Sequence, residues 1–284
     1  MSKVAIVTDS TAYIPAELLS KYQITSVPQV LIWGDETFQD GVNIMPDEFY
    51  KRLGSAKVMP STSQVSPMTL KLAFEKLLVE GFEVCGIFLS SKLSGTIQSA
   101  MQAIEMLPKS KDRIAIVDSN TTAMAMGFIV LEVAKVAQAD ASLKDCVRLA
   151  EVTRENTGVL FVVDTLEFLH RGGRIGGAQR LLGTALNFKP ILELKDGRIE
   201  SLEKVRTKSK AHARVVDILV ERIGSQKNIH LATLHANAEA DARLLLEIAA
   251  SKLHPVEQIF TSVSPVIGTH AGPGTVGLAY MVEK

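Results

Sequence analysis

The sequence has few cysteines, and the two it has are isolated from each other. Cys85 and Cys146 are the only ones among 284 residues, and neither belongs to a CxxC motif or to a cluster with histidine. The pattern indicates neither a zinc site nor a disulfide framework. Isolated thiols of this kind are typical of proteins in a reducing cytosol.

The sequence has no excess of positive or negative charge, and it has few aromatic residues. Lys plus Arg number 31 and Asp plus Glu number 31, so the formal net charge at pH 7 is zero. A chain without a basic excess has no general electrostatic attraction to nucleic acid or to an anionic membrane surface. Aromatic residues make up 5% of the chain, which does not favour base stacking. We therefore expect no nucleic acid partner.

Long hydrophobic runs are missing. The longest apolar stretch, near 123–131, is well below the roughly 20 residues that span a bilayer. The apolar part of the first ten residues, MSKVAIVTDS, is too short for a signal-peptide core. We expect a cytoplasmic protein without stable membrane insertion, so that any lipid-like ligand is sheltered inside the fold.

The signatures of several enzyme classes are absent. The glycine-rich segment 171–177, RGGRIGG, matches neither GxxxxGK[ST] nor the GxGxxG spacing. The chain has no GxSxG, no cysteine with an evident base, and no grouping of aspartates as metal ligands. We expect no metal, no cofactor and no catalysis by the chain itself.

Strand and helix patterns alternate along the first half of the chain. Apolar runs that predict strands occur at 4–7, 25–33, 84–89 and 114–117, with helical spacing between them. Strands separated by helices predict a parallel sheet with helices on its faces. We expect no antiparallel element in this half.

The second half carries a hairpin signal, Asp196-Gly197 between two strand-like runs. The fold class expected is α/β with two domains. The N-terminal domain, 1–157, has a parallel sheet flanked by helices. The C-terminal domain, 158–284, is mixed α/β with the antiparallel hairpin. A helix that begins at Ser142 is the expected bridge between them.

Hydroxyl-rich segments lie where predicted strands end or helices begin, at 8–11, 61–64, 94–96 and 118–122. In open α/β sheets, ligands bind outside the carboxyl ends of the strands. The free N–H groups and the dipole at a helix start favour a carboxylate or phosphate. We expect at least one of these segments to bind an anionic group. Helix capping without a ligand is the alternative for each.

The segment 90–96 is the most informative of these. Ser94 is placed to cap a helix, Gly95 lets a ligand approach the backbone, and Thr96 adds a donor. Whether Asp9 and Asp118, in the neighbouring segments, contact a ligand or cap helices is left open.

Basic and glycine-rich segments supply further candidates. The glycines that follow His270 allow an anion-binding nest of N–H groups, and His270 itself is a donor or an acid–base group; an ordinary glycine turn is the alternative. Arg206 is either a carboxylate clamp or a surface ion pair with Glu203. Arg171 and Arg174 either contact a partner or belong to a solvated basic loop.

These motifs together resemble the DegV family of bacterial fatty-acid-binding proteins, over essentially the whole chain. The segments that carry the resemblance are IVTDST at 6–11, STSQ at 61–64, SSKLSGTIQSA at 90–100, VDS at 117–119, LHRGGRI at 169–175, KVRTKSKA at 204–211 and HAGPGTVG at 270–277. The chain lacks the family's usual proline directly after Gln64, which leaves the hydroxyl of Thr62 in place.

The resemblance implies one long-chain fatty acid, of the palmitate kind (C14–C18), in a buried tunnel, with its carboxylate at the domain interface. Thr62 and Ser94 are implied to hydrogen-bond the carboxylate. The residues implied to surround them are Ser63, Gly95, Thr96, Arg206 and His270.

The resemblance also implies a partner enzyme. Family members act as the carrier subunit of a fatty acid kinase: a separate ATP-dependent kinase converts the bound fatty acid into an acyl phosphate. An acyltransferase then uses it for phospholipid synthesis. The loop with Arg171 and Arg174 is similar to a kinase-docking surface.

Two other function classes remain as alternatives. One is a small-molecule kinase or phosphotransferase related to dihydroxyacetone kinase, using His270 or an aspartate, which the missing nucleotide loop disfavours. The other is a regulator that senses a metabolite, which no DNA-binding helix-turn-helix supports.

Overall fold

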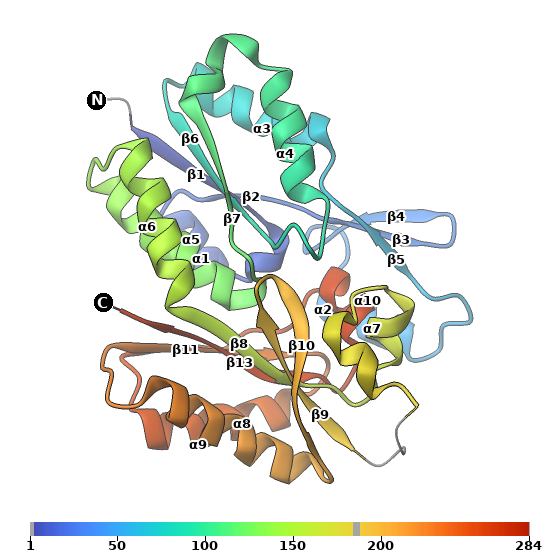
Figure 1. The fold of residues 1–284 in the computed structure, drawn as a ribbon. Coiled ribbons are helices and arrows are strands. Elements are labelled where there is room, and N and C mark those ends of the chain that lie inside the picture. The colour runs from blue at the N-terminus through green and yellow to red at the C-terminus, as the bar shows by residue number, and fades with distance from the viewer. Residues whose placement is uncertain (1–2, 184–187, 284) are drawn as a thin grey trace.

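The computed structural model describes residues 3–183 and 188–283 (Figure 1). Within these ranges the strands form a four-stranded, a six-stranded and a three-stranded sheet, so the protein is mixed α/β as expected. No helix in the described part of the chain has the length and apolar character that a bilayer crossing requires.

The four-stranded sheet is parallel throughout, with the order β2-β1-β6-β7. Its strands are β1 (Val4–Asp9), β2 (Thr25–Val27), β6 (Glu83–Phe88) and β7 (Ile114–Asp118). Val7 and Val84 face the cluster built with α3 (Pro67–Val79) and α4 (Thr96–Glu105), whereas Ile6 and Cys85 face the opposite cluster. Both faces are therefore buried, which explains the continuous apolar runs in the sequence.

The six-stranded sheet has the order β10-β9-β8-β13-β11-β12, and its pairs are antiparallel except β11 with β12. Its strands are β8 (Thr157–Val162), β9 (Lys189–Lys195), β10 (Arg198–Val205), β11 (Ile229–His235), β12 (Glu257–Ile259) and β13 (Val276–Val282). Helices α8 (Lys208–Ile223) and α9 (Glu239–Leu253) cover its outer face (Figure 1). The predicted boundary at 157/158 falls at the start of β8, and the division into domains stays a prediction.

Helix α5 (Ala123–Gln138) lies between the two larger sheets (Figure 1). It packs on β1 and β6 of the parallel sheet and on β8, β11 and β13 of the other. Twelve of its sixteen residues are buried, and they lie on most of its surface, as is usual for a helix inside a core. Helix α6 (Leu143–Glu155) packs beside it. Its N-cap residue is Ser142, whose hydroxyl accepts from the N–H of Asp145 at 3.2 Å.

The three-stranded sheet corrects two predictions. Its strands are β3 (Val30–Trp33), β4 (Glu36–Gln39) and β5 (Ser61–Ser63), paired antiparallel in the order β4-β3-β5. The expected single strand at 25–33 is two strands in different sheets, because Pro28 has no N–H for a continuous ladder. The first half therefore does contain an antiparallel element.

Shorter helices complete the fold. The α-helices are α1 (Ala16–Lys21), α2 (Pro46–Leu53), α7 (Glu167–Arg171) and α10 (Pro265–Ala271), and the 3-10 helices are Ser10–Ala12, Pro108–Arg113 and Gly176–Leu181. The β9–β10 hairpin is confirmed, with Asp196 and Gly197 both at positive φ as a two-residue turn requires.

Candidate ligand-binding site

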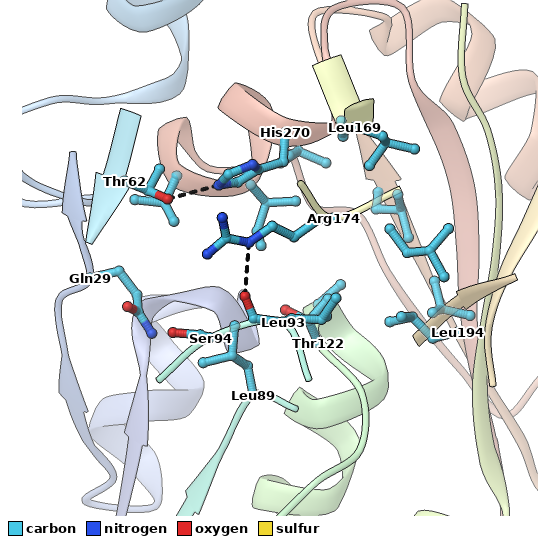
Figure 2. A pocket seen from close by; sticks show the side chains of 18 of the residues that line it. Gln29, Thr62, Leu89, Leu93, Ser94, Thr122, Leu169, Arg174, Leu194 and His270 are labelled. Carbon is cyan, nitrogen blue, oxygen red and sulfur yellow. Dashed lines mark hydrogen bonds between the residues drawn. The ribbon is translucent and has the colours of Figure 1, made fainter. Parts of the chain in front are cut away.

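Residues from both halves of the chain line one cavity (Figure 2). It holds about 870 Å³ of space not occupied by protein atoms, including its opening to solvent. Its lining residues come from segments far apart in the sequence, from Tyr13 to Thr275.

Most of the cavity wall is apolar. The aliphatic and aromatic side chains that line it come from the end of β6, from β8 to β11 and from α7 and α10: Leu89, Leu93, Val159, Phe161, Leu169, Leu194, Ile199, Leu234, Val266 and Ile267. Such a wall offers no hydrogen bonds, so it favours the burial of a hydrocarbon group.

The polar side chains gather on one side of the cavity. In Figure 2 Gln29, Thr62 and Ser94 lie on the left, Arg174 and His270 lie toward the middle, and Leu194 lies on the right. Three of the hydroxyl-rich segments predicted from the sequence, 61–64, 94–96 and 118–122, thus meet here, because Thr122 also lines the cavity. A ligand with a polar head and an apolar tail fits this division.

Thr62 is held by a strand rather than by the turn that the sequence suggested. It lies in β5, opposite Leu31 of β3, and its neighbour Ser63 also lines the cavity. Thr62 Oγ1 is 2.7 Å from Nε2 of His270. The hydroxyl thereby has one partner in the protein and retains capacity for a ligand.

His270 belongs to the last turn of α10, which corrects the expected glycine nest. The N–H of Gly272 donates to Gly268 O at 2.9 Å, and the N–H of Gly274 donates to Ala236 O at 2.8 Å. These groups are therefore not available to an anion. The ring of His270 packs on Gly172, where a Cβ atom would overlap Nδ1.

The histidine is neutral at physiological pH. Burial, and to a smaller extent the nearby Arg174 guanidinium, lower the pKa of His270 to about 4. Nδ1 is buried without a partner. An unpaired buried N–H is costlier than an unpaired lone pair, so the ring carries its proton on Nε2 and donates it to Thr62. The Thr62 hydroxyl is then free to donate to a ligand.

Ser94 and Gly95 lie between β6 and the start of α4, as predicted, but the expected cap by Ser94 is wrong because Gly95 takes that position. Ser94 lines the cavity, while Gly95 is the N-cap residue of α4 and lies against the amide of Gln64. Thr96 is fully buried behind them, and its Oγ1 lies 3.0 Å from Ser94 Oγ. Thr96 therefore supports the site instead of lining it.

Arg174 lies in the site, where the sequence suggested a partner contact. The chain turns after α7 through Gly173, which has φ of +69°, and this brings Arg174 back toward the cavity. Its Nε donates to Leu93 O at 3.0 Å and its Nη1 to Gly172 O at 2.7 Å. Figure 2 shows the guanidinium between Thr62 and Ser94, where it offers positive charge to the cavity.

The other arginines lie outside the cavity. Arg171 is exposed on α7 and pairs with Glu167 at 2.6 Å. Arg206 is exposed after β10 and is not among the cavity-lining residues, so the structure does not bring this predicted ligand contact to the site. The alternative pairing of Arg206 with Glu203 is also wrong, because Glu203 binds Arg214 at 2.7 Å.

Asp9 and Asp118 act inside the protein. Asp9 is buried and accepts from the N–H of Leu89 at 3.1 Å. Asp118 accepts from the N–H of Ser91 at 3.2 Å and of Asn120 at 2.9 Å. Both carboxylates hold the turns that shape the cavity, and neither lines it. In residues 3–183 and 188–283, no three His, Cys, Asp or Glu side chains are grouped to hold a metal ion.

Gln29 is a polar lining residue that sequence reasoning missed. It follows Pro28 at the break between β2 and β3 and is 2% exposed. A single glutamine within an apolar run carries no motif, and only the three-stranded sheet reveals its direction. Arg174 had a signal, the glycine pair before it, but the sequence does not say which way the turn points the side chain.

Comparisons with known proteins agree over the full length. The model of the DegV family of uncharacterised proteins matches residues 3–283. A DegV domain-containing protein of Halalkalibacterium halodurans is 38% identical over the whole of both chains. A second, from Streptomyces coelicolor, is 38% identical over 97% of each chain.

Solved structures are similar to the same extent. A DegV family protein of Thermus thermophilus, described for its fatty acid binding, has a TM-score of 0.93 and 33% identity, covering 99% of this chain and 100% of that one. DegV of Bacillus subtilis, described as a fatty acid binding protein, has a TM-score of 0.90 and 33% identity over the whole of both chains.

Proposed function

Because this chain belongs to the DegV family, we propose that its cavity binds one long-chain fatty acid, with the carboxylate between Thr62, Ser94 and Arg174. The observation that carries the proposal is the division of the cavity into a polar side and a long apolar wall (Figure 2). Family members of similar structure are described as fatty acid binding proteins.

The energetics support this orientation. A carboxylate that leaves water needs replacement donors, and the hydroxyls of Thr62 and Ser94 with the Arg174 guanidinium supply them. Each buried CH₂ group adds about 0.8 kcal/mol, so the tail of a long-chain acid contributes most of the affinity. The neutral His270 adds no charge, and Arg174 balances that of the carboxylate.

Mass spectrometry of the purified protein, native and after organic extraction, tests this function. We expect one fatty acid per chain, or stoichiometric uptake of added palmitate or oleate by the delipidated protein. A protein that neither retains nor takes up a fatty acid contradicts the proposal. Hydrolysis of ATP, or phosphoryl transfer to a small hydroxylated compound, by the isolated chain would instead favour the phosphotransferase alternative.

We propose further that the chain acts in the cytoplasm as a carrier without its own catalysis. It presents the carboxylate to a separate ATP-dependent kinase, and an acyltransferase then uses the acyl phosphate for phospholipid synthesis. The gradient of burial supports presentation: Thr62, Ser94 and His270 are partly exposed, while Phe161 and Leu234 on the apolar wall are buried. The carboxylate end is therefore the part of the ligand nearest to an approaching enzyme.

A charge reversal separates kinase docking from ligand binding. Arg171→Glu alters an exposed residue near the polar side of the cavity, and Arg148→Glu, on α6, is the control. In the presence of a bacterial fatty acid kinase and ATP, Arg171→Glu is expected to lower acyl phosphate formation, trapped as the hydroxamate, with unchanged palmitate binding. Equal activity of both variants contradicts a docking role for Arg171.

A further inference from the structure

Ser94 is the end of a chain of hydrogen bonds that runs through the buried Thr96 to the buried Gln29, which lies near Asp9. Thr96 Oγ1 lies 3.0 Å from Ser94 Oγ and accepts from Gln29 Nε2 at 3.0 Å. The side chain of Gln29 also lies near the carboxylate of Asp9 and lowers its pKa. Asp9 and Thr96 have no exposed surface, and Gln29 almost none. Each donor among these buried side chains therefore needs an acceptor within the same hydrogen-bonded series.

Asp9 accepts hydrogen bonds from every partner at the buried end of this series of side chains. Its Oδ1 accepts from the N–H and the hydroxyl of Thr11, at 3.0 and 2.6 Å, and its Oδ2 accepts from the N–H of Leu89 at 3.1 Å. All three groups act as donors, which is the environment of an ionised carboxylate. Burial raises the pKa of Asp9, and the hydrogen bonds from Thr11 and Leu89, together with the nearby side chain of Gln29, oppose that rise.

Gln29 donates from Nε2 to Thr96 Oγ1 at 3.0 Å. The nearby carboxylate of Asp9, which only accepts hydrogen bonds, favours this orientation of the NH₂ group. The orientation of the amide is thus set by its neighbours and not by the ligand.

Thr96 in turn donates hydrogen bonds to Ser94. Because Thr96 Oγ1 accepts from Gln29, its own proton points to Ser94 Oγ at 3.0 Å rather than to Gln29 Oε1 at 3.4 Å. The backbone N–H of Thr96 also donates to Ser94 Oγ, at 3.3 Å. Both lone pairs of the Ser94 hydroxyl are therefore used, and what remains is its O–H hydrogen.

We propose that Gln29 and Thr96 are positioning residues that fix the Ser94 hydroxyl as a donor toward the cavity and so select a head group that only accepts. This inference rests on the proposed fatty acid binding and names the basis of its selectivity. Around the head group, Ser94, Thr62 and Arg174 all donate (Figure 2). A carboxylate can accept from all three, whereas the O–H of a fatty alcohol finds no acceptor among them.

The affinities of delipidated full-length protein for palmitate and for 1-hexadecanol test the proposal, since the two ligands share a tail. Thr96→Val keeps the shape of the side chain and removes the hydroxyl that links Gln29 to Ser94. We expect it to weaken palmitate binding by about tenfold, as for one hydrogen bond to a charged group. Binding of 1-hexadecanol should change by less than about twofold, because a released Ser94 can accept from an alcohol.

Two more variants separate positioning from a general structural effect. Thr96→Ser restores the hydroxyl and should restore the preference for palmitate over the alcohol. Gln29→Met removes the amide and should lower that preference as Thr96→Val does, even if one of the two variants folds poorly.

The outcomes are distinct. Equal losses for both ligands in Thr96→Val and Gln29→Met, or palmitate binding unchanged in both, would overturn the positioning role while leaving fatty acid binding intact. Wild-type protein that binds no fatty acid would overturn the proposed function and the inference with it. A selective loss for palmitate that Thr96→Ser reverses supports both.

Discussion

Thr62 Oγ1 and His270 Nε2 lie 2.7 Å apart although 208 positions separate the two residues in the chain. The bond joins β5 of the first half to α10 of the second, at the polar side of the cavity. It aligns the Thr62 hydroxyl by occupying one of its acceptor positions. The ligand-facing donor is therefore produced by the packing of two distant segments.

Replacement of Thr62 measures this donor directly. Thr62→Val keeps the shape and the β propensity and removes the hydroxyl, so we expect palmitate affinity to fall about tenfold to a hundredfold. The melting temperature should change little, because the side chain is only partly buried. Thr37→Val, on the exposed face of the same small sheet, is the matched control for both measurements. Full affinity in Thr62→Val would exclude a role for the hydroxyl in binding.

Gly172 is predicted to tolerate no side chain because of the histidine above it. A Cβ at this position would overlap Nδ1 of His270, so Gly172→Ala should displace the ring and break its bond to Thr62. We expect weaker palmitate binding and a lower free energy of unfolding. The backbone itself accepts alanine, since Gly172 has φ of −73°.

Gly54→Ala is the control for that experiment. Gly54 also follows the last residue of a helix, has φ of −61°, and has only ordinary contacts at its Cβ position. It should bind palmitate like the wild type and be equally stable or more so, because alanine reduces the entropy of the unfolded chain. A Gly172→Ala protein that behaves like Gly54→Ala would show that the ring can move without cost.

His270 also predicts a pH dependence of stability. Its pKa is about 4 in the folded protein against an ordinary value of 6.5, because it is buried and lies near Arg174. Between these values the unfolded chain binds a proton that the folded protein does not. The stability is therefore complete above pH 6.5 and is lost as the pH falls toward 4, by up to about 3 kcal/mol.

His270→Gln isolates this contribution, since glutamine does not titrate. We expect the difference in free energy of unfolding between wild type and variant, from urea titrations, to decrease by about 2–3 kcal/mol from pH 7.5 to pH 4.5. Burial raises the pKa of Asp9 and of Asp40, so these carboxyl groups lower the free energy of unfolding as the pH rises. This contribution is the same in both proteins and cancels in the difference. A difference that stays constant with pH would contradict a lowered histidine pKa.

The sequence predicted the periodic parts of the fold well. The parallel strands at Val4–Asp9, Glu83–Phe88 and Ile114–Asp118 are buried on both faces, and their apolar runs show it. The Asp196-Gly197 turn was equally clear, because few turns other than a tight hairpin need two residues at positive φ. Short edge strands such as β5, three residues of Ser and Thr, have no such pattern and looked like a turn.

The site was predicted only in part, because residues within local motifs are recognisable in the sequence and residues placed by tertiary packing are not. Thr62, Ser94 and His270 stand in motifs, and the structure places all three in one cavity. Gln29 and the inward turn of Arg174 depend on tertiary packing. Arg206 is exposed, and its local sequence left both a carboxylate clamp and a surface ion pair open. Which side of a turn faces a cavity is decided by segments that lie far away in the chain.

The tip of the β9–β10 hairpin supplies the last prediction, which concerns ligand release. Leu194 and Ile199, at the tip, line the cavity, but β8 pairs with β9 only as far as Glu193. The turn beyond is held to the parallel-sheet half by Ser90, whose hydroxyl donates to Gly197 O at 2.8 Å, and by Lys92, whose Nζ donates to Asp196 O at 2.6 Å.

Ser90→Ala should therefore loosen the tip, because it removes the buried one of these two bonds. We expect faster backbone hydrogen exchange in 194–199 and faster dissociation of palmitate in a stopped-flow transfer assay, with the affinity lowered in proportion. Ser251→Ala, whose exposed hydroxyl bonds only within α9, is the control. If exchange at 194–199 rises while dissociation does not, the hairpin is mobile but does not limit release. The ligand then leaves by another part of the cavity wall.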